Sequence, residues 1–72
     1  SDIAAVADQL MKLPLEENLL LLKGMPEKRI ADLLQTLAAG DAKSIKRGQE
    51  LFQAISSNKS GTAADPSTAS RN

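Results

Sequence analysis

The sequence predicts an all-α fold, a compact array of four short helices with a disordered C-terminal tail. Two observations lead to this prediction. Apolar residues recur at spacings of three and four through residues 2–56, which is the period of helices buried on one side. Proline and glycine interrupt the same stretch at short intervals, so each helix is closed after a few turns. We expect a helical domain over residues 1–56 and a tail or linker over 57–72.

The first two helices are predicted over residues 2–13 and 14–23. Asp2 is a favourable N-cap for the first helix. Pro14 disfavours helical geometry at the residue before it but suits the first turn of a new helix, where its missing N–H is not needed. Gly24 follows the second helix as a C-cap.

The third and fourth helices are predicted over residues 26–38 and 42–56. Pro26 opens the third helix, Gly40 ends it and Asp41 caps the fourth. The fourth helix carries one stripe, formed by Ile45, Gly48, Leu51, Phe52 and Ile55. The glycine in this stripe costs the helix about 1 kcal/mol relative to alanine. Its presence indicates either a tolerant surface position or a close approach of another helix.

After Ser56 the composition changes to serine, threonine, glycine and proline with alanine as the only apolar residue. Such a segment cannot offset the conformational entropy lost on ordering. This is why the tail is predicted to be disordered.

Composition limits the chemistry of the chain. It has no cysteine and no histidine, which removes disulfides, thiolate metal sites and the commonest general base. Glu16 and Glu17 are adjacent on one helix and point in different directions, so they are interpreted as first-turn acids favoured by the helix dipole. We therefore expect no enzyme activity, no metal and no cofactor.

Location is predicted from two further features. The leucine run of residues 19–22 is far shorter than the roughly 20 residues that cross a bilayer. The chain opens on Ser1 and Asp2, and no secretory signal is visible there. We expect a cytoplasmic protein without membrane insertion.

The second predicted helix is apolar around most of its circumference. Either it is simply the central core helix, or one side packs internally while the other binds a partner. Because a domain this small has a marginal core, the second interpretation leads to the functional prediction. The chain is then a protein–protein interaction module, adaptor or regulator, that docks another protein or a second copy of itself. The predicted contact residues are Leu15, Leu19, Leu20, Leu21 and Met25.

A nucleic-acid-associated regulator is the alternative function. Lys43, Lys46 and Arg47 share one face of the fourth predicted helix and could contact phosphates. Against it, basic and acidic residues balance at nine each, and Phe52 is the only aromatic residue available for stacking on bases. The simpler interpretation of these cations is the solvated face of an amphipathic helix.

The predicted helices repeat with an offset of 12 residues, so that Leu10, Leu22 and Leu34 align and Pro14 aligns with Pro26. The segments that carry the pattern are Leu10-x-x-Leu13-Pro14-x-Glu16, Leu21-Leu22-x-x-Met25-Pro26-Glu27 and Ala31-x-Leu33-Leu34-x-x-Leu37. This pattern resembles the helical repeats of the flagellar rotor protein FliG and of the amino-terminal domain of MgtE magnesium transporters. The resemblance implies a right-handed array of short helices that serves as a protein-docking or cytoplasmic regulatory module.

Overall fold

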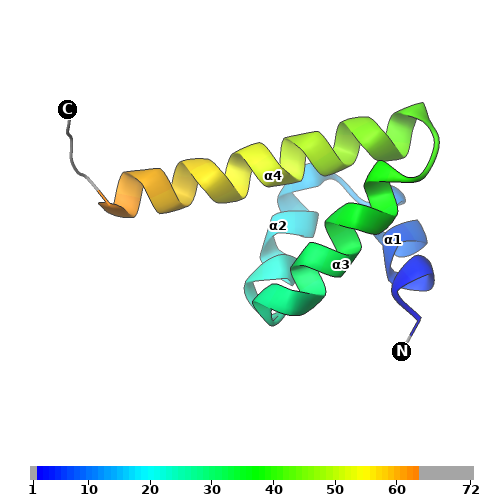
Figure 1. Cartoon of the computed structure of the whole chain (residues 1–72), viewed down its shortest axis with the longest axis horizontal. Helices are drawn as coiled ribbons and strands as arrows, with labels where there is room; N and C mark the ends of the chain where they lie inside the picture. Colours follow the sequence, from blue (N-terminus) through cyan, green and yellow to red (C-terminus); the bar gives the residue numbers. More distant parts are fainter. Residues whose placement is uncertain (1, 64–72) are drawn as a thin grey trace.

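The computed structural model describes residues 2–63, with side chains described for residues 2–57. Its elements are α1 (Ile3–Met11), α2 (Leu15–Lys23), α3 (Glu27–Ala38) and α4 (Ala42–Ala63). The described residues contain no strand, so the predicted all-α array of four helices is confirmed. Helices α1, α2 and α3 gather beneath the first half of α4, which continues beyond them as a long arm (Figure 1). None of the helices in this part of the chain is long and apolar enough to cross a membrane.

Proline sets the entry of the two middle helices. Pro14 and Pro26 stand immediately before α2 and α3 in extended geometry, with φ of −67° and −61°. Each is thus the cap and not the first helical residue that the sequence predicted. The carbonyl oxygen of Pro14 accepts hydrogen bonds from the backbone N–H groups of Glu17 and Asn18, which starts the helical pattern. The proline ring therefore ends one helix and begins the next within a few residues.

Aspartates cap the two other helices, as predicted. Asp2 accepts a hydrogen bond of 3.0 Å from the backbone N–H of Ala4. Asp41 accepts one of 2.9 Å from the backbone N–H of Ser44. Hydrogen bonds from the Ser44 backbone and hydroxyl, with the nearby Lys43 ammonium, hold the pKa of the Asp41 carboxyl below its ordinary value. The Asp41 carboxylate therefore stays ionised throughout the neutral range. Its negative charge also interacts favourably with the positive, N-terminal end of the α4 dipole.

Helix α4 ends at Ala63, seven residues beyond the end predicted from the composition. Polar residues after Ser56 have modest helix propensity, but none of them prevents the helix from continuing before Pro66. The prediction treated the loss of apolar periodicity as the end of the helix. The remainder of the predicted tail, residues 64–72, lies outside the described residues.

One apolar core joins all four helices. Helix α3 packs against both α4 and α1, while α2 packs against α4. The fully enclosed side chains of Leu33 and Leu51 mark the centre of this core, where α3 meets α4. Burial of each such leucine contributes about 1.5–3 kcal/mol. The buried apolar side chains of this core are those of Ala7, Leu10, Leu22, Leu33, Leu37 and Leu51.

Gly48 allows α3 and α4 to approach closely. It is buried, and a Cβ atom added to it would lie 3.2 Å from the Cβ of Leu37 on α3. This distance is shorter than an ordinary van der Waals contact between carbons. Of the two interpretations that the sequence allowed, close helix approach is the one the structure shows.

We expect Gly48→Val to destabilise the fold by about 1–3 kcal/mol, although valine favours a helix more than glycine does. The added side chain must push α3 away from α4 at Leu37. The matched control is Gln49→Val, at the exposed neighbouring position, which should change stability by less than about 0.5 kcal/mol. Urea denaturation of the three proteins measures both effects. Equal stability of the two variants would show that the close approach is unimportant.

Candidate functional site

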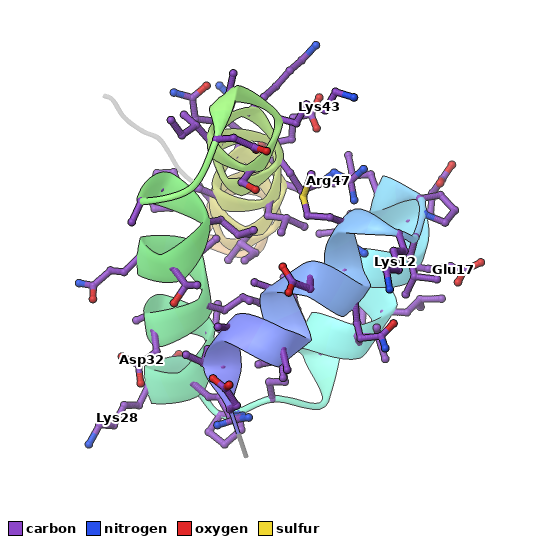
Figure 2. All side chains as sticks on the ribbon, turned by 90° about the vertical axis from the view of Figure 1, so that its right-hand side faces the viewer. Lys12, Glu17, Lys28, Asp32, Lys43 and Arg47 are labelled. Carbon is purple, nitrogen blue, oxygen red and sulfur yellow. The ribbon has the colours of Figure 1, made fainter. Side chains whose placement is uncertain are left out.

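Arg47 connects α4 to the corner between α1 and α2. Its side chain is only 19% exposed and extends from α4 toward the end of α1 (Figure 2). The Nη1 group donates to the carbonyl oxygens of Leu13 and Leu10, at 2.8 and 3.1 Å, and to Oδ1 of Asn18 at 2.7 Å. Because guanidinium is always charged, these are the stronger, charge-assisted type of hydrogen bond.

Asn18 completes this network from α2. Its side chain is fully buried, and its Nδ2 donates to the carbonyl oxygen of Leu10 at 3.1 Å while its Oδ1 accepts from Arg47. The last carbonyls of a helix have no partner within the helix, and Pro14 has no N–H to offer one of them. The Leu10 carbonyl accepts from the backbone N–H of Leu13 at 3.1 Å and gains further donors from Asn18 and Arg47, while Arg47 also donates to the Leu13 carbonyl. The corner network, defined as Asn18, Arg47 and the Leu10 and Leu13 carbonyls, therefore ends α1 and ties it to α2 and α4.

The corner network was not predicted from the sequence. One signal for it was present, because Asn18 occupies the apolar stripe of α2 between Leu15 and Leu22. A lone amide on a buried helical stripe requires a partner. Nothing in the sequence indicates that the partner is Arg47, which is 29 residues away.

The three cations of the predicted nucleic-acid face are placed differently from one another. Lys43 and Lys46 are exposed, whereas Arg47 turns inward to the corner network. Beside them, a hollow of about 290 Å³ also contains Glu50, whose Oε1 is 3.8 Å from Nε of Arg47. All three cations line this hollow, but only the two lysines are exposed, and the Arg47 side chain is mostly buried between its hydrogen-bond acceptors and Glu50.

The predicted contact residues of α2 also divide into two groups. Leu15, Leu19 and Met25 are partly buried and pack against the core. Leu20 and Leu21 are 64% and 51% exposed, and we call this pair of adjacent side chains the ridge of α2. The prediction of one continuous leucine surface therefore keeps only these two exposed members.

A second apolar surface lies between α3 and α4. We call it the α3/α4 groove: two hollows of about 510 and 290 Å³ that share Leu34 and Phe52 as lining residues. Phe52 is 60% exposed and Ile45, in the larger hollow, is 38% exposed. Glu27, at the start of α3, is the one ionisable side chain that lines either hollow. The groove offers apolar contact and glutamine amides, and no group placed for acid–base or nucleophilic chemistry.

The apolar stripe of α4 is covered only in part. Leu51 is completely buried, but its neighbour Phe52 lies about 100° further round the helix and faces outward. Two adjacent large apolar residues cannot both face the same neighbouring helix. That Phe52 is the only aromatic residue of the chain was the available sequence signal for this surface.

Comparisons of the chain with protein-family models, with curated proteins and with solved structures give no match. The resemblance to the FliG and MgtE helical repeats therefore stays a hypothesis. Among residues 2–63 no group of three acidic side chains is placed to hold a metal ion.

We expect Arg47→Met to lower the free energy of unfolding by about 2–4 kcal/mol, because it leaves buried acceptors without their charged donor. Methionine retains much of the apolar stem, so the loss reports mainly the hydrogen bonds. Lys46→Met, one residue earlier and exposed, is the matched control and should change stability by less than about 0.5 kcal/mol. Urea denaturation gives both values. Equal effects at the two positions would contradict a structural role for Arg47.

Proposed function

We propose that this chain is a non-enzymatic, cytoplasmic protein–protein interaction module that docks its partner in the α3/α4 groove. The observation that supports this most is Phe52, a large aromatic side chain that is 60% exposed beside an apolar hollow. Aromatic residues next to pockets are the positions at which protein interfaces concentrate their binding energy. Grooves between two helices are also a recurrent seat for helices of a partner.

The polarity of the groove favours a protein over a nucleic acid. A phosphate backbone requires cations, and neither hollow is lined by lysine or arginine. On the other side of α4, Arg47 already binds three acceptors in the corner network. The nucleic-acid alternative then depends on Lys43 and Lys46 alone.

The ridge of α2, formed by Leu20 and Leu21, is the alternative docking surface. Leu20 and Leu21 are as exposed as Phe52, but no described hollow adjoins them. A ridge needs a groove on the partner, whereas the α3/α4 groove supplies its own concave surface. We therefore place the principal contact at Phe52 and keep the ridge as the comparison.

Capture from native extract with three immobilised proteins tests the proposal. We expect the wild type and Leu20→Glu to retain the same partner band, and Phe52→Glu to lose at least nine-tenths of it, since loss of a hot spot weakens binding by about 30-fold or more. The two substitutions introduce the same charge at equally exposed leucine and phenylalanine positions. Retention of that band by Phe52→Glu and its loss in Leu20→Glu would move the docking surface to α2.

A further inference from the structure

We propose that the occupant of the α3/α4 groove is a second copy of this chain, in a reversible homodimer with two-fold symmetry. This proposal rests on the proposed function, because it uses the same groove. It goes further by naming the partner and the register in which the two copies meet.

The first argument is the shape of the groove. Phe52 protrudes, and the larger hollow beside it extends along α4 to Ile45, about two helical turns away. An isologous contact needs a projection and a recess on the same face, so that each copy fills the other's recess. The midpoint between Ile45 and Phe52 falls between Gly48 and Gln49. A two-fold axis there, with the two α4 helices antiparallel, places Phe52 of each copy against Ile45 of the other.

The second argument is charge. A quarter of the residues in the chain are charged, yet Glu27 alone represents them in the lining of the two hollows. It belongs to the smaller hollow, at the end of the groove away from Ile45. An antiparallel pairing therefore puts the two Glu27 carboxylates at opposite ends of the interface. No like charges are brought together, and the chain as a whole has no net charge to repel a second copy.

The third argument is size, and it sets the strength of the dimer. Seven residues line the larger hollow and six the smaller one. A standard stable interface uses about 20–30 residues on each side. The groove supplies about half of that, so the dimer is weak and exchanges with the monomer. Dissociation constants between about 1 µM and 1 mM define the range in which it must be sought.

Sedimentation velocity over that concentration range is the first test. We expect the wild type and Leu20→Glu to shift from monomer toward dimer together, and Phe52→Glu to weaken dimerisation by at least about 30-fold. Ala38→Arg is a second groove variant, which adds a charge to the larger hollow without removing an apolar side chain. It should weaken the dimer as well. Circular dichroism verifies that each variant keeps the helical fold.

Cross-linking tests the register directly, because the natural chain has no cysteine. In the proposed dimer the two Gln49 residues lie next to the symmetry axis. We expect Gln49→Cys to form a covalent dimer on air oxidation, with two thiols joined as one disulfide and oxygen as the electron acceptor. Leu20→Cys, on the ridge of α2, should remain largely monomeric under the same conditions.

A wild-type chain that stays monomeric up to about 1 mM overturns the homodimer. If Phe52-dependent capture of a different protein is then observed, the proposed interaction function stands and only the identity of the occupant is wrong. Absence of both self-association and capture rejects the two proposals together. Self-association that is lost equally in Phe52→Glu and Leu20→Glu, or equal cross-linking at the two cysteine positions, also rejects the stated register.

Discussion

The arrangement of the four helices depends on the hydrogen bonds from Arg47 and Asn18 to the end of α1. Proline after a helix gives a sharp turn, but it also removes a backbone donor from the carbonyls at that turn. Here the Leu10 carbonyl keeps one backbone donor, the N–H of Leu13, and a buried amide from α2 and a guanidinium from α4 add side-chain donors to the Leu10 and Leu13 carbonyls. The consecutive helices α1 and α2 are thereby tied to α4, which lies far from them in sequence, in a domain that has no disulfide to do so.

The corner network also determines which side of α4 faces each of its neighbours. One side carries Arg47 to the corner network, and a second side presents Leu51 and Gly48 to α3. Phe52 and Ile45 are left facing outward beside α3, where α1 and α2 do not reach to cover them. The view along α4 shows α3 on one side of this helix and α1 with α2 on the other (Figure 2). The α3/α4 groove thus stays open because the opposite side of α4 contacts the corner network.

The fold class and the order of the helices could be predicted from the local chemistry of the sequence. Pro14, Pro26 and Asp41 act within a few residues of their own positions, so their effects can be predicted from neighbours alone. Periodicity likewise placed the buried Leu51 on the apolar stripe of α4. What it could not supply is which of two adjacent apolar residues faces inward, since that depends on the direction from which another helix approaches. For this reason Leu51 is buried while Phe52 is exposed, and Leu22 is buried while Leu21 is exposed.

Arg47 was misassigned for a related reason. In the sequence it belongs to a run of cations with a common spacing, and only the tertiary fold brings it to the carbonyls of Leu10 and Leu13. The α2 surface was overestimated because the shielding of Leu15, Leu19 and Met25 by neighbouring helices cannot be read from one helix alone. Long-range hydrogen bonds and shielding are properties of the packed chain.

A double-mutant cycle between Asn18→Leu and Arg47→Met tests the central claim most directly. If the two side chains act as one network, the double variant should lose about 1–3 kcal/mol less than the two single losses added together. Leucine has the same branching and number of heavy atoms as the buried asparagine, with bulkier methyl groups, and it removes both the donor and the acceptor. Losses that add to within about 0.5 kcal/mol would show that Asn18 and Arg47 stabilise the fold independently, and the corner network would not be the constraint described.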